Sequence, residues 1–63
     1  MKFHGSTKIH PSAIISEGAE IGSHCEIGPF SVIGSEVILK DNVLVKSHVV
    51  ISGQTTIGSG SII

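Results

Sequence analysis

The sequence predicts an all-β fold in which one chain winds into a parallel solenoid of about three stacked coils. Two observations support this prediction: an aliphatic residue returns every six positions, and a small residue returns at the same interval, four positions later. A helix would repeat its apolar positions every 3.6 residues, and a strand packed on one face every two. A period of six with glycine beside the aliphatic residue indicates a chain that turns after each short strand.

The first column of the repeat is aliphatic, and we expect it to fill a narrow interior. Glycine follows the aliphatic residue directly in several repeats. Because it has no side chain, we expect it to lower the conformational energy of the sharp turn at that corner. The ten aliphatic positions, all Ile, Leu or Val, are Ile9, Ile15, Ile21, Ile27, Ile33, Leu39, Val45, Ile51, Ile57 and Ile63. The four glycines that follow them are Gly22, Gly28, Gly34 and Gly58.

The second column holds the small residues, which we expect to point inward as well. Charged residues after position 8 avoid both columns, so the other four positions of each hexad should lie outward or at corners. The members of this small column are Ala13, Ala19, Cys25, Ser31, Val37, Val43, Val49, Thr55 and Ser61.

The length of one side does not by itself fix how many sides each coil has. Pro11 and Pro29 occupy the same corner position three hexads apart, which favours a coil of three sides with one hexad on each. The predicted inward ladders are then Ile9/Ile27/Val45/Ile63, Ile15/Ile33/Ile51 and Ile21/Leu39/Ile57. Repeat units of this kind bury their apolar face only by stacking on their neighbours.

The bulk properties of the chain limit the possible functions. The 63 residues carry a formal net charge of −1 with both signs scattered, which gives no sign of a nucleic-acid or anionic-membrane partner. The single cysteine cannot form an internal disulfide. No apolar run approaches the length of a membrane span, and the opening "MKFHGSTK" lacks the apolar core of a secretory signal. We therefore expect a cytoplasmic protein without membrane insertion.

The repeat, written [Ile/Leu/Val]-Gly-x-x-small-x, resembles the hexapeptide repeats of left-handed parallel β-helix acyltransferases. The resemblance covers residues 9–63, which we expect to form the hexapeptide β-helix, with residues 1–8 as a lead-in. The left hand is implied by the resemblance alone, because it departs from the usual right-handed crossover of parallel strands.

Three segments narrow the resemblance to one family of acyltransferases: "IHPSAIISEGAEIG" at residues 9–22, "IGPFSVIG" at 27–34 and "VKSHVVISGQTTIG" at 45–58. They resemble the amino-terminal coils of the UDP-N-acetylglucosamine O-acyltransferases, which perform the first step of lipid A synthesis. Two related families carry a separate domain before their hexads, and we expect neither of them here, because only a short segment precedes Ile9 in this sequence. The resemblance implies a homotrimer whose active sites lie between subunits. It also implies transfer of an (R)-3-hydroxyacyl chain from acyl carrier protein to the glucosamine 3-hydroxyl, with a histidine as general base.

The catalytic histidine and substrate-binding residues of that family lie beyond position 63. We therefore assign no catalytic, cofactor-binding or metal-binding residue in this chain, and no cofactor. His24 and His48 fall at outward corner positions, where we expect them to be solvated or packed in an interface. No two histidines lie three hexads apart as stacked ligands would, although zinc shared between subunits stays open. Cys25 should be a buried thiol that packs as a small hydrophobe.

One outward column carries a partner prediction. The residues before three stacked aliphatic positions are Ile14, Val32 and Val50, which form a stripe of exposed aliphatic side chains on one side of the solenoid. Such a stripe usually marks an interface, so we predict that this side lies in the homotrimer. The alternative is ordinary β-propensity in outward strand positions.

The chain stops at Ile63, one residue into a tenth repeat, without a polar cap. We expect a truncated carboxyl-terminal end and no transferase activity for this piece alone. Two alternatives remain open: another hexapeptide acyltransferase that depends on acetyl-CoA, and a non-catalytic trimeric β-helix scaffold.

Overall fold

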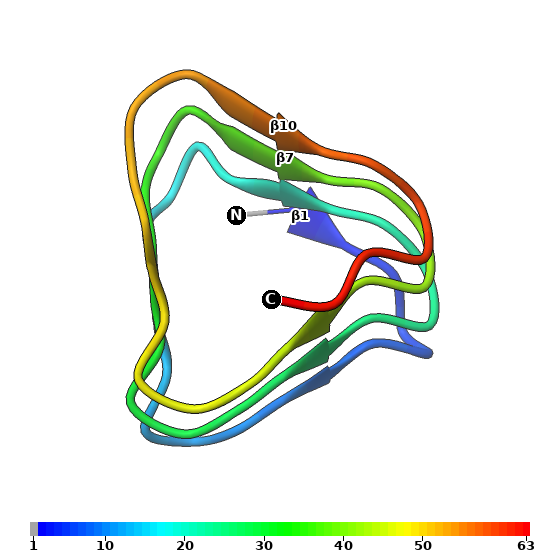
Figure 1. Cartoon of the computed structure of the whole chain (residues 1–63), viewed down its shortest axis with the longest axis horizontal. Coiled ribbons are helices and arrows are strands. Elements are labelled where there is room, and N and C mark those ends of the chain that lie inside the picture. The colour runs from blue at the N-terminus through cyan, green and yellow to red at the C-terminus, as the bar shows by residue number, and fades with distance from the viewer. Residues whose placement is uncertain (1) are drawn as a thin grey trace.

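The computed structural model, which describes residues 2–63, is a left-handed parallel β-helix of about three coils. Viewed down its axis the chain traces a triangle, and successive coils lie on top of one another (Figure 1). The strands in the described part of the chain form three parallel sheets, one on each side of the triangle. The predicted fold class is confirmed.

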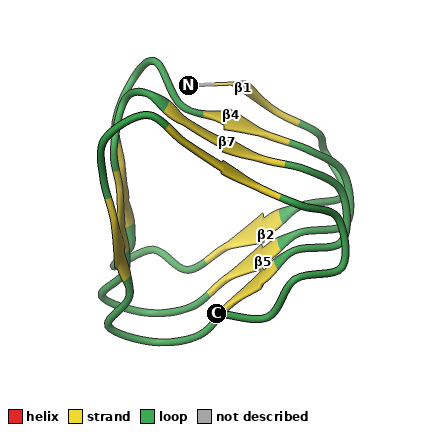
Figure 2. Cartoon of the chain, turned by 45° about the horizontal axis from the view of Figure 1, so that its top comes forward, coloured by secondary structure: helices red, strands yellow, loops and turns green. Residues whose placement is uncertain are grey.

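The first sheet has the order β1-β4-β7-β10, the second β2-β5-β8 and the third β3-β6-β9 (Figure 2). The first sheet consists of β1 (Lys2–Phe3), β4 (Glu20–Ile21), β7 (Val37–Leu39) and β10 (Thr55–Ile57). The second consists of β2 (Lys8–Ile9), β5 (Glu26–Ile27) and β8 (Leu44–Val45). The third consists of β3 (Ile14–Ile15), β6 (Val32–Ile33) and β9 (Val50–Ile51).

Paired strands are offset by one coil, or three hexads, throughout. Ile9 pairs with Ile27 in the second sheet, and Ile15 pairs with Ile33 in the third. The three-sided arrangement and the three predicted ladders are therefore confirmed. Strand β1 lies within the expected lead-in, yet Phe3 pairs with Ile21, so the coil register begins before residue 9.

Three corners join the sheets. The first corner, between the first and second sheets, comprises residues 4–7, 22–25, 40–43 and 58–61. The second corner, between the second and third sheets, comprises residues 10–13, 28–31 and 46–49. The third corner leads back to the first sheet through residues 16–19, 34–36 and 52–54.

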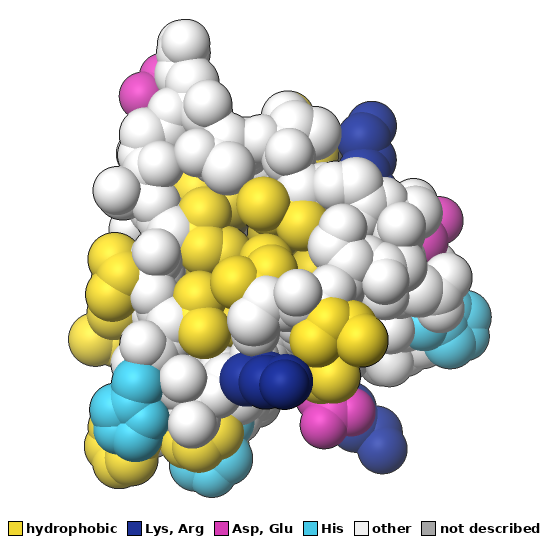
Figure 3. Space-filling view, in the orientation of Figure 1, with side chains coloured by type: hydrophobic (Ala, Val, Ile, Leu, Met, Phe, Trp, Pro, Cys, Tyr) yellow, Lys and Arg dark blue, Asp and Glu magenta, His cyan; other side chains and the backbone are white. Residues whose placement is uncertain are grey.

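Both predicted inward columns form the core. The buried apolar side chains are Ala19, Ile21, Cys25, Ile27, Ile33, Val37, Leu39, Val43, Val45 and Ile51. Members of the same columns in the outermost coils, such as Ile15 and Ile57, are half-buried because a neighbouring coil covers them on one side only. Figure 3 shows hydrophobic side chains gathered in the middle of the triangle at one end of the prism. The core is thus a stack of layers, each of which is buried by the layers above and below it.

The small column also carries a buried hydrogen-bond ladder. Thr7, Cys25 and Ser31 each donate from the side chain to a carbonyl 15 residues further on. The donor–acceptor distances are 2.6 Å from Thr7 Oγ1 to the Gly22 carbonyl, 3.0 Å from Cys25 Sγ to the Lys40 carbonyl, and 2.7 Å from Ser31 Oγ to the Lys46 carbonyl. Among the residues that the structure describes, no buried side-chain nitrogen or oxygen lacks a partner. Small polar residues in this column therefore tie each coil to the next.

The expectation that glycine makes the sharp turn after the aliphatic residue is wrong at Gly22 and Gly28, since neither has a positive φ angle. Their role is to allow the next coil to approach closely. A Cβ atom at Gly22 would lie 2.9 Å from the backbone nitrogen of Asp41, and one at Gly28 would lie 2.8 Å from the Lys46 carbonyl oxygen. Glycine is needed there because another coil lies against it.

The left-handed turn falls two positions after those glycines. His24 and Asn42 adopt positive φ angles of 56° and 60° at the first corner, where Gly60 has 77°. Phe30 and His48 adopt 60° and 58° at the second corner. Asparagine and histidine tolerate this conformation comparatively well, whereas a bulky residue such as phenylalanine is strained in it.

Candidate functional site

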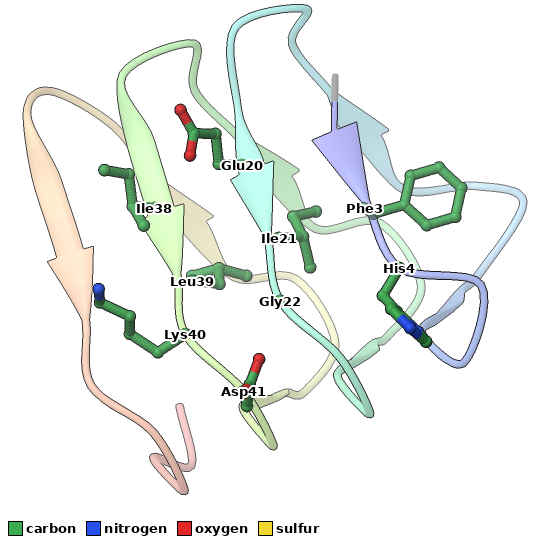
Figure 4. Close-up of a pocket in the computed structure, with 9 residues that line it drawn as sticks. All are labelled: Phe3, His4, Glu20, Ile21, Gly22, Ile38, Leu39, Lys40 and Asp41. Carbon is green, nitrogen blue, oxygen red and sulfur yellow. The ribbon is translucent and has the colours of Figure 1, made fainter.

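A shallow groove of about 440 Å³ runs over the outer face of the first sheet at its first corner. Strands β1, β4 and β7 and the residues that follow them supply its walls (Figure 4). Its lining residues are Phe3, His4, Glu20, Ile21, Gly22, Ile38, Leu39, Lys40 and Asp41. This volume is sufficient for a small ligand or for part of a larger one.

Gly22 is one of the residues that line the groove. It lies between the coil that carries His4 and the coil that carries Lys40 and Asp41 (Figure 4). Because Gly22 has no Cβ atom, the Asp41 carboxylate of the next coil can lie directly against the Gly22 backbone. Charged and aromatic residues of successive coils therefore line the groove around Gly22.

Hydrogen bonds to Ser23 hold the Asp41 carboxylate in its ionised form. The Ser23 backbone N–H donates to Asp41 Oδ1 at 2.8 Å. This bond, then the Ser23 hydroxyl, and then the charges of His24 and His4 keep the pKa of Asp41 below its ordinary value of 3.8. Asp41 is thus a fixed negative charge at the edge of the groove near neutral pH.

Two histidines from successive coils meet at this corner. The rings of His4 and His24 stack with centroids 6.5 Å apart and an interplanar angle of 19°. His4 and His24 occupy different positions of the hexad, so the three-hexad spacing of stacked ligands does not predict this pair. Among residues 2–63, no group of three or more His, Cys, Asp and Glu side chains is placed to hold a metal ion.

At the second corner, His48 is exposed and stacks on Phe30, with ring centroids 5.1 Å apart. The outward placement predicted for His24 and His48 is confirmed by their exposure. Cys25 is buried as predicted, and its thiol also donates to the Lys40 carbonyl, a role that packing alone does not describe.

The predicted aliphatic stripe forms on the third sheet. Ile14 pairs with Val32, which pairs with Val50 in the next coil. Ile14 and Val50 are 63% and 70% exposed, and Phe30 at the adjoining corner is 60% exposed. The alignment of the stripe is confirmed, as is the exposure of Ile14 and Val50, whereas Val32 at its centre is half-buried. The role of the stripe as an interface stays a prediction.

The groove offers groups for binding. Phe3 presents an aromatic ring that is about half exposed, Glu20 and Asp41 present carboxylates, and Lys40 an ammonium group. His4 does not offer a free Nδ1, because that nitrogen is engaged by Ser6. The assignment of no catalytic, cofactor-binding or metal residue in this chain stays a prediction.

Sequence reasoning missed three groups that shape these corners. Thr7 falls within the expected lead-in, yet it is buried and begins the hydrogen-bond ladder of the small column. The spacing gives the signal, because Thr7 lies one hexad before Ala13. The second group is the pair of His-x-Ser sequences at residues 4–6 and 10–12, whose recurrence one hexad apart could have indicated a repeated corner contact. The third is Asp41, for which no recurring sequence pattern was noted.

No helix in the described part of the chain is long and apolar enough to cross a membrane. A family model described as bacterial transferase hexapeptide (six repeats) matches residues 2–35, more than half of the chain. No curated protein sequence matches the chain.

Proposed function

The chain belongs to the bacterial transferase hexapeptide family, and from this premise we propose that it forms the amino-terminal coils of an O-acyltransferase. That enzyme would move an (R)-3-hydroxyacyl chain from acyl carrier protein to the 3-hydroxyl of UDP-N-acetylglucosamine, the first step of lipid A synthesis. The main support is the unbroken hexad register, together with the resemblance of three segments, residues 9–22, 27–34 and 45–58, to that enzyme family.

In this proposal the three coils act as a scaffold. Residues 9–63, with strand β1 before them, belong to a longer hexapeptide β-helix, and the general-base histidine belongs to coils outside this sequence. The chain on its own would therefore transfer no acyl group. It would supply a rigid prism on which later coils stack, and a surface on which neighbouring subunits meet.

The same proposal assigns two further copies of the chain as partners. The support is the aliphatic stripe of Ile14, Val32 and Val50 on the third sheet, in which Ile14 and Val50 are exposed, together with the exposed Phe30 at the adjoining second corner. Aliphatic groups stacked in this way lose unfavourable contact with water when another copy covers them. A trimer would bring three such sides together around one axis.

The test is to sequence the gene beyond the Ile63 codon and to assay the complete protein with two acyl donors, 3-hydroxyacyl carrier protein and acetyl-CoA. We expect more hexads, a histidine in the middle coils, and transfer from 3-hydroxyacyl carrier protein to UDP-N-acetylglucosamine. Transfer from acetyl-CoA alone would replace the proposal with the acetyl-CoA-dependent acyltransferase. A product that assembles but transfers from neither donor would favour the scaffold.

A further inference from the structure

The two corners that flank the third sheet carry charges of opposite sign. Lys46 is exposed at the second corner, and the residues of that corner include no Asp or Glu. Glu17 and Glu36 are exposed at the third corner, and the residues of that corner include no Lys or Arg. Between these corners lies the uncharged aliphatic stripe. The third side of the prism is therefore positive at one edge, apolar in the middle and negative at the other edge.

The other two sides lack this separation of charge within residues 2–63. The first corner, which both of them share, carries the two signs side by side in Lys40 and Asp41. The outward column of the second sheet also carries both signs, since Lys8 pairs with Glu26 in the next coil. The pattern thus belongs to the third side, the same side that carries the stripe.

The fold holds the backbone of both charged edges in place. The Lys46 carbonyl accepts a hydrogen bond from Ser31 Oγ at 2.7 Å. The Glu36 carbonyl accepts from the Thr55 N–H at 3.3 Å, and Glu36 Oε2 accepts from Gln54 Nε2 at 3.4 Å. A cation and a carboxylate therefore start from fixed positions on opposite edges of one side.

The heights of these charges along the solenoid axis select one pair. One coil, from Ile9 to its partner Ile27, rises by about 4.8 Å, the spacing of neighbouring strands. On this scale Lys46 lies about 3 Å further along the axis than Glu36 and about 8 Å further than Glu17. A closed ring repeats by rotation without a rise, so groups in contact across it lie at similar heights. Lys46 therefore matches Glu36 better than it matches Glu17.

We propose that copies of this chain assemble with their axes parallel, and that Lys46 at the second corner of one copy pairs with Glu36 at the third corner of the next. This inference rests on the proposed assembly of three copies through the third side, and it adds which edges meet. Rotation about one shared axis joins unlike edges, because such a contact is heterologous. An inverted copy would instead bring Lys46 against Lys46, and like charges oppose that arrangement.

The second corner also exposes an aromatic ring that this contact would cover. Phe30 stacks on His48 and is 60% exposed. Its φ angle of 60° is strained for a bulky side chain, and within one chain the ring gains little burial in return. The edge of the next copy would remove part of this ring from water.

The test measures the association of the full chain by sedimentation equilibrium at low ionic strength. Lys46→Glu and Glu36→Lys each place like charges at every contact, so we expect each contact to weaken about two- to fivefold, the range of an exposed ion pair. A ring of three has three such contacts, so the trimer association constant should fall about tenfold to a hundredfold. The double variant Lys46→Glu/Glu36→Lys exchanges the two charges and should recover most of the wild-type association.

Glu26→Lys is the matched control. Glu26 is an exposed strand residue on the second sheet, and its replacement changes the net charge by the same amount as Glu36→Lys. This control should associate as the wild type does. Salt gives a second readout, because screening at about 0.5 M should narrow the difference between Glu36→Lys and the wild type.

The outcomes separate this pairing from the assembly on which it rests. If the single variants associate as tightly as the wild type, or if the double variant associates no better than they do, the pairing of Lys46 with Glu36 is wrong and the assembly stands. A wild type that stays monomeric at every concentration overturns both. Acyl transfer by the complete protein is a separate measurement, so neither result is mistaken for a failure of the proposed reaction.

Discussion

At the scale of single residues, one column of the hexad serves two purposes in the same fold. Gly22 and Gly58 both follow an inward aliphatic residue, two coils apart. The backbone of residues 40 and 41 crosses close above Gly22, whereas nothing within 4 Å would meet a Cβ atom at Gly58. The structure therefore distinguishes two glycines that the repeat treats alike.

We expect Gly22→Ala to lower the free energy of unfolding by about 1–3 kcal/mol, the usual cost of forcing an extra carbon into a packed site. The atoms in the way belong largely to the backbone, which cannot rotate aside as a side chain can. Chemical denaturation of the purified chain measures the effect.

Gly58→Ala is the control for this prediction. Its change should stay within about 0.5 kcal/mol, as for ordinary surface substitutions. Equal destabilisation by the two variants would contradict the steric account of Gly22.

At the scale of elements, the strands were predictable and the corners were not. The aliphatic and small columns have a strict period, so residues such as Ile33 and Ser31 could be placed in the core from the sequence alone. The corner contacts depend on side-chain chemistry as well as on the period. Ser23 donates to Asp41 one coil away, whereas His4 and His24 occupy different positions of the hexad and stack along the corner.

The aliphatic stripe and the groove illustrate the same difference. The stripe follows from the three-hexad register, which places Ile14, Val32 and Val50 in line. The groove combines an aromatic ring, charged side chains and the Gly22 backbone, and the period of the aliphatic and small columns does not predict this combination. The spacing of Thr7 fits the small column, but Thr7 precedes Ile9, the first aliphatic position of the repeat, and was therefore not predicted to be buried.

The first corner also predicts a pH dependence in acid. Because the pKa of Asp41 in the folded chain is below its ordinary value of 3.8, its ionised form stabilises the fold above that pH. This contribution should be lost as the pH falls below about 4 and through the folded-state pKa. Asp41→Asn should therefore flatten the decrease in stability in this range, as measured by urea midpoints.

The control for this effect is Glu17→Gln, which removes one exposed carboxylate at the third corner. It should leave the decrease below about pH 4 close to that of the wild type. If Asp41→Asn and Glu17→Gln behave alike, the hydrogen bonds from Ser23 do not set the acid response.

At the scale of the whole molecule, the three sides of the prism differ in what they present to solvent. The first sheet carries the groove, with Glu20 and Lys40 among its exposed side chains. The third sheet carries the aliphatic stripe, with Ile14 and Val50 well exposed. This asymmetry is why we propose the third side as the surface where subunits meet.

Val32→Lys introduces a charge into the centre of that stripe. In a trimer each copy would carry the same charge into an apolar contact, where desolvation and repulsion both oppose association. In the free prism the lysine can extend into water along its alkyl stem, so the fold should persist. Thr56→Lys is the matched control, because Thr56 is an exposed strand residue on the first sheet.

Sedimentation velocity of the wild type, Val32→Lys and Thr56→Lys at one protein concentration tests most directly whether this prism is the assembling base of a transferase. The account predicts a trimer of the 6.5 kDa chain for the wild type and for Thr56→Lys, and a shift to monomer for Val32→Lys. A wild type that sediments as a folded monomer, or a Val32→Lys variant that remains trimeric, would contradict it.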